Sequence, residues 1–149
     1  MIPSRFGFAL DGYSGSPELA SPAFLASFLS DTCEAAGMRL IDLAIRNVEG
    51  SIPEGERWHD EGGISAHALI STSHICLHTW PKDSFFMLDV VSCRPFDIEH
   101  VKTFVLLRLN VKAIKRFEVT VDDDGDPMVQ DGARACARAT RRAAPAAPG

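Results

Sequence analysis

The chain has 149 residues and a mass of 16.2 kDa, which is the size of a single domain. Hydrophobic residues make up 46% and charged residues 23%, so a wholly disordered or fibrous protein is excluded. The net charge of −5 argues against general nucleic-acid binding, and no apolar run reaches the ~20 residues that cross a bilayer. The N-terminus lacks the charged-then-apolar layout of a signal peptide, which predicts a cytoplasmic protein.

Charge is unevenly distributed along the chain. Residues 132–149 carry four arginines and no acidic residue, and they are rich in Ala and Pro. A basic end can be a nucleic-acid or membrane arm, but arginines without aromatic neighbours are more typical of a solvated, frayed terminus. We therefore expect residues 1–131 to form the domain and residues 132–149 to form a disordered tail, with neither nucleic acid nor membrane as a partner.

The first third of the chain predicts a strand, a helix and a second strand. Residues 5–12 alternate large apolar side chains with smaller ones, which is the period of a half-buried strand. Ser21 followed by Pro22 predicts the start of a helix that runs to Gly37, because serine caps a helix and proline suits its first turn. Residues 38–48, rich in Leu and Ile, predict the next strand. The apolar residues at helical spacing are Phe24, Leu25, Phe28, Leu29 and Cys33.

The rest of the chain predicts three more strands, a helix and a last strand. The predicted elements are a polar loop at 51–63, strands at 64–72, 74–80 and 85–93, a helix capped by Asp97, and a strand at 112–121. The inner face of that helix would carry Ile98, Val101, Val105 and Leu109. This order predicts an α+β two-layer sandwich, an antiparallel sheet with helices on one face. The other face would be left for a site or for a partner subunit.

Reactive side chains gather between residues 65 and 93, inside otherwise apolar strands where each buried polar group needs a partner. They are Ser65, His67, Ser71, Ser73, His74, Cys76, His78 and Cys93. One interpretation is metal binding through histidine nitrogen and cysteine sulfur. His74 and His78, however, lie about 13 Å apart along one strand, too far to share an ion without a bend. The cysteines show no CxxC spacing, so we expect no zinc ribbon and no dedicated metal site.

Two covalent interpretations compete with the metal site. One is Ser–His or Cys–His hydrolysis, but the sequence contains no G-x-S-x-G elbow. The other is an internal acyl shift, in which a serine attacks the preceding carbonyl and turns a peptide bond into an ester that then eliminates. Ser73 is well placed for this shift because it lies where two predicted strands meet. The residues alone do not choose between these routes.

Four short motifs of this segment resemble the small prokaryotic S-adenosylmethionine decarboxylases, which are self-cleaving pyruvoyl enzymes. The motifs are Gly63-Ile64-Ser65, Thr72-Ser73-His74, His78-Thr79-Trp80-Pro81 and Cys93. The similarity covers about residues 5–121, and His-Thr-Trp-Pro five residues after the serine is its most specific part. The resemblance implies the fold of that family, a homodimer joined near the exposed sheet face, and a role in polyamine (spermidine) biosynthesis.

The resemblance also implies a role for each motif residue. Cleavage before Ser73 would give a β chain of residues 1–72 and an α chain whose first residue becomes the pyruvoyl group, a cofactor made from the chain itself. That ketone would form a Schiff base with the substrate amine and act as an electron sink. His78 and Ser65 match residues that assist processing, His78 by taking the proton from the α-carbon of Ser73. Cys93 matches the acid that protonates the substrate carbon after CO₂ leaves. Strict strand alternation puts Ser73 and His78 on opposite faces, so a turn or bulge must re-aim one of them.

Two positions depart from the family pattern. Thr72 replaces the usual Glu before the cleaved serine, although the shift needs only the carbonyl of this residue. Lys82 replaces a Glu that grips the ribose hydroxyls of the substrate, and an ammonium group only donates hydrogen bonds. Trp58 and His59 fall where the family places a ring that stacks on adenine. Together with Trp80 and Lys82 they are the expected substrate contacts.

Lys82 keeps alternatives open beside S-adenosylmethionine, which we expect as the leading substrate. One alternative is pyruvoyl-dependent decarboxylation of ornithine or arginine, with an acid such as Asp11, Asp89 or Glu61 holding the distal cation. The other is an inactive paralogue that binds and regulates an active partner. The joint presence of the motif residues argues against this last interpretation.

Overall fold

The structure is a computed structural model that describes residues 4–48 and 63–121. Its strands are β1 (Phe6–Ser14), β2 (Arg39–Asn47), β3 (Ile64–Ser71), β4 (Ser73–Trp80), β5 (Phe85–Ser92) and β6 (Val111–Val121). Its helices are α1 (Pro22–Ala35), α2 (Ile98–Arg108) and the short 3₁₀ helices η1 (Pro17–Ala20) and η3 (Pro81–Asp83). The predicted order of strands and long helices is confirmed, whereas η1 and η3 were not predicted. The expected tail at 132–149 lies outside the described residues.

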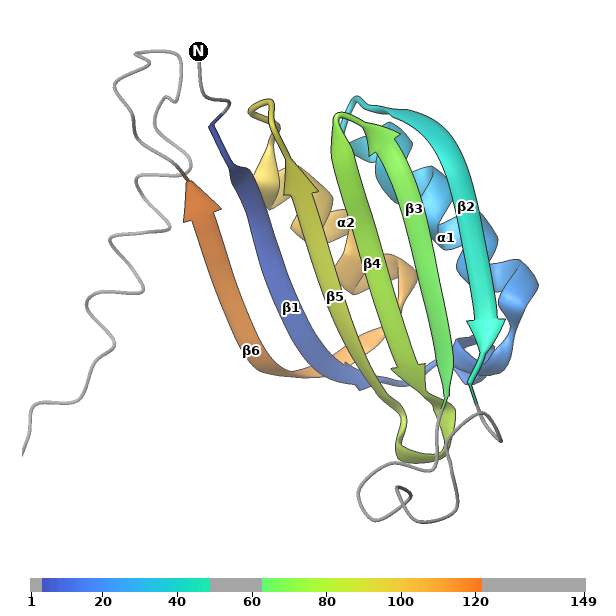
Figure 1. Ribbon diagram of the computed structural model, residues 1–149. Coiled ribbons are helices and arrows are strands. Elements are labelled where there is room, and N and C mark those ends of the chain that lie inside the picture. The colour runs from blue at the N-terminus through green and yellow to red at the C-terminus, as the bar shows by residue number, and fades with distance from the viewer. Residues whose placement is uncertain (1–3, 49–62, 122–149) are drawn as a thin grey trace, which may run out of the picture.

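All six strands form one antiparallel sheet in the order β2-β3-β4-β5-β1-β6. Helices α1 and α2 lie side by side on one face of this sheet (Figure 1). The predicted α+β two-layer architecture is therefore confirmed. We call the face opposite the helices the open face, because no described element covers it.

Both long helices begin at the predicted caps. The hydroxyl of Ser21 accepts a hydrogen bond from the backbone N–H of Phe24 at 3.2 Å, and Pro22 follows as the first helical residue. The carboxylate of Asp97 accepts from the N–H of His100 at 2.9 Å. Each cap satisfies a backbone donor that has no partner inside the helix. None of the helices in the described part of the chain is long and apolar enough to span a bilayer.

The core lies between the helices and one face of the sheet. Strands expose alternate residues to opposite faces, so every second residue of the central strands faces the helices. Those of β3, β4 and β5 are buried: Ile64, Ala66, Ala68, Ile70, Ile75, Leu77, Phe86, Leu88 and Val90. The predicted apolar residues of both helices pack against them. This packing fixes which residues the same strands present on the open face.

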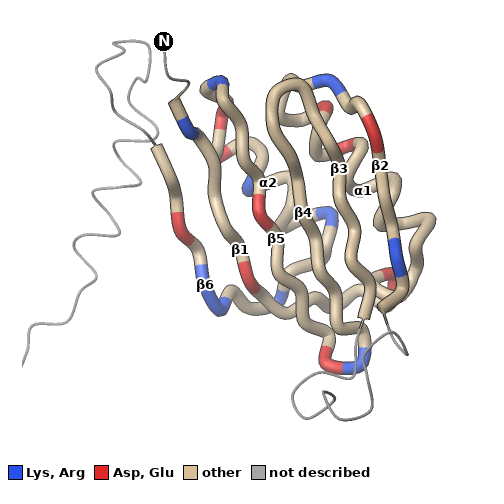
Figure 2. The backbone as a smooth tube through the Cα atoms, viewed as in Figure 1, with Lys and Arg blue, Asp and Glu red and all other residues tan. Residues whose placement is uncertain are grey.

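Most polar residues of the central strands lie on the open face, together with Trp80 and Met87. The polar ones are Ser65 and His67 on β3, His74, Cys76 and His78 on β4, and Asp89 on β5. Strands β3 and β4 contain no Lys, Arg, Asp or Glu, and the charged residues of the sheet lie on its other strands (Figure 2). The open face over β3 and β4 is thus polar but without formal charge when its histidines are neutral.

Candidate active site

The turn between β3 and β4 contains the serine that the sequence singled out. Thr72 alone separates the two strands, and Ser73 begins β4 opposite Ile70 of β3 and Ser92 of β5. Ser73 has a φ of 145°, a region that side-chain-bearing residues rarely adopt. Such a conformation costs on the order of 1–3 kcal/mol and persists only where the surrounding structure enforces it. The chain is therefore held in a strained backbone conformation at Ser73.

The carbonyl of Thr72 is held by the neighbouring strand. The backbone N–H of Cys93, which directly follows β5, donates to this oxygen at 3.1 Å. The guanidinium of Arg94 donates to the carbonyl of Ser71 at 3.5 Å. The successive carbonyls of Ser71 and Thr72 therefore each accept a hydrogen bond from the segment that follows β5. A donor at the Thr72 oxygen is placed where negative charge would develop if a nucleophile attacked this carbonyl.

The hydroxyl of Ser73 has a histidine beside it. Its Oγ lies 3.3 Å from Nδ1 of His74, which accepts the hydroxyl proton when its own ring proton is on Nε2. The turn therefore assembles a hydroxyl, an acceptor for its proton and a donor on the adjacent carbonyl. These are the three groups that an acyl shift from nitrogen to oxygen requires.

Ser65 and His78 form a second cluster, farther along the same strands. They are direct partners in the register of β3 and β4, and Ser65 Oγ lies 3.0 Å from Nδ1 of His78. His78 lies five positions along the strand from Ser73, about 16 Å away. No register shift interrupts β4, so the strand has no bulge at Ser73, and the irregular feature of this residue is its positive φ. Within one chain, His78 and Ser73 are not brought together.

Cys93 belongs to the Ser73 cluster. Its side chain is exposed, and its backbone lies against the carbonyl of Thr72 across the hairpin turn. The two residues that the resemblance links in catalysis, Ser73 and Cys93, are thus adjacent in space although 19 residues separate them in sequence. The decisive contact is made by a backbone amide, which no residue pattern reveals.

A third polar group occupies the middle of the open face. Cys76 Sγ lies 3.3 Å from Nδ1 of His67, and Asp89 is the register partner of Cys76 on β5. Burial raises the pKa of the Cys76 thiol, and the charge of Asp89 raises it further. The described residues contain no set of three or more His, Cys, Asp or Glu side chains able to hold a metal ion. The cysteine–histidine pair was not predicted, because it depends on the hairpin register.

The expected substrate contacts lie at the His78 end of the sheet. The ring centroid of Trp80 is 6.3 Å from that of His78 and 5.5 Å from that of Phe85, whose ring also contacts Tyr13 at 5.3 Å. Lys82 lies in η3 next to this aromatic row and is exposed. Within one chain, Trp80 and Lys82 accompany His78 and not Ser73. Trp58, His59 and Glu61 lie outside the described residues.

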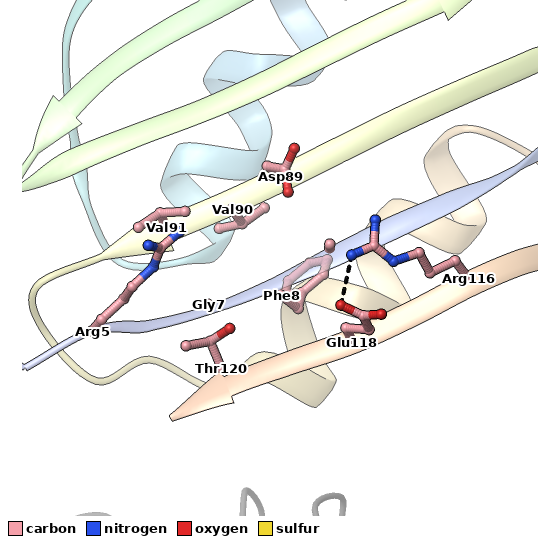
Figure 3. A pocket seen from close by; sticks show the side chains of 10 residues that line it. Arg5, Gly7, Phe8, Asp89, Val90, Val91, Arg116, Glu118 and Thr120 are labelled. Carbon is pink, nitrogen blue, oxygen red and sulfur yellow. Dashed lines mark hydrogen bonds and ion pairs between the residues drawn. The ribbon is translucent and has the colours of Figure 1, made fainter. Parts of the chain in front are cut away.

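Two of the acidic residues suggested for a distal cation, Asp11 and Asp89, lie in the described part of the chain and have basic or polar neighbours there. Arg116 approaches the carboxylate of Asp11 at 3.8 Å. The same guanidinium binds Glu118 at 2.6 Å, as Figure 3 shows. Burial raises the pKa of Asp11, and the charge of Arg116 partly opposes this effect. Asp89, Arg116 and Glu118 line a shallow pocket of about 160 Å³ on the open face. Asp11 lies five residues of strand from the Ser73 end of the sheet, about 16 Å.

Comparison with known proteins identifies the family of the chain. The family model described as S-adenosylmethionine decarboxylase matches residues 8–120, a range that overlaps every strand of the described sheet. The chain belongs to this family. The suspected resemblance is therefore confirmed, and the protein is a carboxy-lyase of the S-adenosylmethionine decarboxylase family.

Individual relatives carry two different names. The arginine decarboxylase proenzyme of Caldivirga maquilingensis is 29% identical over 102 residues, 66% of this chain and 68% of the relative. The S-adenosylmethionine decarboxylase proenzyme of Pyrobaculum arsenaticum is 30% identical over 87 residues, 56% of this chain and 70% of the relative. Membership of the family is thus shown, while the substrate within it is left open.

A solved structure supports the fold. The crystal structure of the adenosylmethionine decarboxylase from Aquifex aeolicus superposes with a TM-score of 0.65 at 17% sequence identity. The match covers 88% of this chain and 100% of the other. At this identity the likeness shows the fold alone, and it agrees with the two-layer architecture described above.

Proposed function

We propose that the protein is a pyruvoyl-dependent S-adenosylmethionine decarboxylase that cleaves itself between Thr72 and Ser73. The observation that carries this proposal is the hairpin turn, where the Ser73 hydroxyl lies beside His74 and the Cys93 amide donates to the Thr72 carbonyl. A turn serving only as a connection needs neither the positive φ of Ser73 nor a donor on the preceding carbonyl. A role in polyamine synthesis, leading to spermidine, goes with this substrate.

Processing would proceed in two stages at this turn. Ser73 Oγ attacks the carbonyl carbon of Thr72, the C–N bond breaks, and the peptide becomes an ester. His78 then takes the α-proton of Ser73, and the ester leaves as a new carboxylate on Thr72. Tautomerisation and addition of water release ammonia and leave a keto group in place of the hydroxyl. Thr72 takes part only through its carbonyl, so its departure from the family pattern does not remove a reacting group.

The finished site would use the same residues differently. The pyruvoyl group supplies an electron sink for the charge left on the substrate when CO₂ departs. The thiol of Cys93, next to the turn, donates a proton to the substrate carbon. Its exposure leaves room for a substrate to enter beside it.

The distance between the two clusters supports a homodimer of processed chains. Ser65 and His78 lie about 16 Å from Ser73 in one chain, so a second copy must supply them if they act on Ser73. Two copies packed through their open faces in opposite directions would place His78 of the second copy over Ser73 of the first. Over β3 and β4 the open face bears the exposed Leu69 and no Lys, Arg, Asp or Glu, as expected for a surface that a partner buries.

Decarboxylation of arginine or ornithine is the second candidate function. It is favoured by Lys82, which replaces the ribose-gripping carboxylate of the family, and by the name of the Caldivirga maquilingensis relative. Lys82 is exposed at the aromatic end of the open face, where a substrate bound across two copies would contact it. The pyruvoyl chemistry is the same for both candidates.

The proposal is tested first by gel electrophoresis and mass spectrometry of the purified chain. We expect two fragments, residues 1–72 and residues 73–149, with a keto group at the start of the second. Ser73→Ala should remain a single 16.2 kDa chain. An intact, unmodified wild-type chain would overturn the proposal and favour the inactive paralogue. Release of labelled CO₂ from S-adenosylmethionine, arginine and ornithine then decides the substrate, and turnover of an amino acid alone selects the second candidate.

A further inference from the structure

The four described histidines differ in what their rings contact. His78 Nδ1 is occupied by the hydroxyl of Ser65 at 3.0 Å, and His67 Nδ1 faces the thiol of Cys76 at 3.3 Å. His100 lies exposed on α2, on the helix side of the sheet. Only the ring of His74, among these, lies against the hydroxyl of Ser73, with Nδ1 at 3.3 Å from Oγ. The histidine next to the serine and the histidine of the His-Thr-Trp-Pro motif therefore have different partners.

We infer that His74 is the base that activates Ser73 for the acyl shift, a role that the family resemblance assigned to no residue. The inference rests on the proposed self-cleavage, but it concerns a step earlier than the one proposed for His78. His74 touches the reacting oxygen, whereas His78 of the same chain lies about 16 Å along β4. The two histidines thus divide the two stages of processing.

A single base is enough for the acyl shift, because only one proton has to be moved. His74 Nδ1 takes the proton of Ser73 Oγ as the oxygen attacks the carbonyl carbon of Thr72. The proton then passes from His74 to the backbone nitrogen of Ser73 as the C–N bond breaks and the amine leaves. Atoms and charge balance without any other reactant, because the ester is an isomer of the peptide. The Cys93 amide stabilises the negative oxygen between these two transfers.

His74 lies in a shallow hollow of the open face. The side chain is half-buried and lines a shallow pocket of about 160 Å³ together with Asp42 and Leu69. The positive φ of Ser73 is stored strain at the reacting residue, and cleavage of the bond before Ser73 removes the restriction. The ring of His74, the amide of Cys93 and the strained backbone of Ser73 are thus all found at the peptide bond between Thr72 and Ser73.

The experiment uses hydroxylamine, which cuts esters and spares peptide amides, on the purified full chain. His74→Asn keeps a hydrogen-bonding group beside Ser73 but cannot act as a base. We expect its cleavage to slow by about 10²–10⁴-fold, the usual contribution of a general base, and the chain to resist hydroxylamine. His78→Asn should stop one stage later and be cut by hydroxylamine between Thr72 and Ser73. His100→Asn, remote from the turn, is the matched control and should cleave like wild type.

A second variant separates a base from a structural role. His74→Ala should process slowly and regain cleavage when imidazole is added, since a small base can enter the space left by the ring. Melting temperatures of both variants show that they are folded. Wild-type cleavage rates in His74→Asn, accumulation of ester in it, or no response of folded His74→Ala to imidazole would overturn the inference. Failure of the wild-type chain to cleave would instead overturn the proposed function, so the two failures are distinguishable.

Discussion

Cys93 contributes its backbone and its side chain to two different stages. The N–H of this residue holds the carbonyl of Thr72 before cleavage, and the exposed thiol next to it is the proposed proton donor in the finished enzyme. Any residue other than proline supplies the first group, whereas only an acidic side chain supplies the second. A substitution of the Cys93 side chain should therefore affect decarboxylation without affecting processing.

Cys93→Ala should consequently cleave but fail to decarboxylate. We expect the two fragments on a gel to form as in wild type, and release of CO₂ to fall by about 10²–10⁴-fold. Cys76→Ala removes a thiol of the same face that lies beside His67, and it should keep both activities. Loss of cleavage in Cys93→Ala would show that the thiol itself acts in processing.

Arg116 lies beside both Asp11 and Glu118, but the pKa values of these two carboxyl groups shift in opposite directions. Burial raises the pKa of Asp11 above its ordinary value of 3.8, so its charged form is less favourable in the fold than in the unfolded chain. The hydrogen bond from Arg116 lowers the pKa of Glu118 below 4.5, so its charged form is favoured. Protonated Asp11 therefore contributes to the free energy of unfolding. This contribution is complete below the pKa of the unfolded chain and is lost as the pH rises through the higher pKa of the folded chain. The contribution of Glu118 is present above its unfolded pKa and is lost as pH falls.

Substitutions at these two positions should therefore shift stability in opposite directions at pH 7. Asp11→Asn should raise the free energy of unfolding, and its advantage should shrink as the pH falls through about 4. Glu118→Gln should lower it slightly, because the Arg116 pair is exposed, and the difference should vanish in acid. Urea unfolding at pH 4 and pH 7 measures both. Changes of the same sign at pH 7 would contradict this account.

Among the elements, the β3–β4 hairpin determines the geometry of both clusters. Its register pairs Ser65 with His78 and leaves a single-residue connection before Ser73. The start of the hairpin is set by Gly63, where an added Cβ would lie 1.9 Å from the carbonyl oxygen of Thr79. Only glycine allows the backbone of the two strands to approach this closely. The edge strands β2 and β6 carry charges, which discourages pairing with further strands.

Gly63→Ala should lower the free energy of unfolding by about 2–3 kcal/mol, because backbone must move to admit the methyl group. It should also slow self-cleavage if the register of the hairpin shifts. Gly37→Asn is the matched control, since Gly37 has a φ of 66° that asparagine tolerates and open space around it. Thermal unfolding and a cleavage time course measure the two effects. Equal losses in both variants would indicate that close approach is not the cause.

The whole molecule has two chemically different surfaces. One layer presents the outer sides of α1 and α2, with the ion pair of Arg108 and Asp31 between them. The other is the open face, where β3 and β4 contain no Lys, Arg, Asp or Glu. A sheet that packs helices on one face only leaves the second face to solvent or to another chain. The separation of Ser73 from His78 makes a second copy the occupant that the proposed chemistry needs.

Two exposed leucines on opposite surfaces test this dimer. Leu69 is 51% exposed on the open face, and Leu107 is 77% exposed on α2. Leu69→Arg should convert the dimer to a monomer in size-exclusion chromatography. Leu107→Arg should leave the oligomeric state unchanged. A monomer from Leu107→Arg instead would place the interface on the helix layer.

Periodicity in the sequence predicted all six strands and both long helices, because each buries one face and repeats accordingly. The caps Ser21 and Asp97 were readable for the same local reason. The 3₁₀ helices η1 and η3 were missed, since short proline-containing segments look like turns. The partner of each site histidine was not readable either. Whether His78 meets Ser65, and whether His74 meets Ser73, depends on register and on one backbone angle.

The amino-acid sequence by itself determined the chemical groups, the two-layer fold and the family, because periodic burial and the spacing of short motifs are local properties. Only the tertiary structure decided which groups meet. Pairing of β3, β4 and β5 brings the amide of Cys93 to the carbonyl of Thr72, while the rise of about 3.3 Å per residue keeps His78 away from Ser73. Contacts across strands depend on how the sheet is assembled, and a linear pattern of residues does not contain that information.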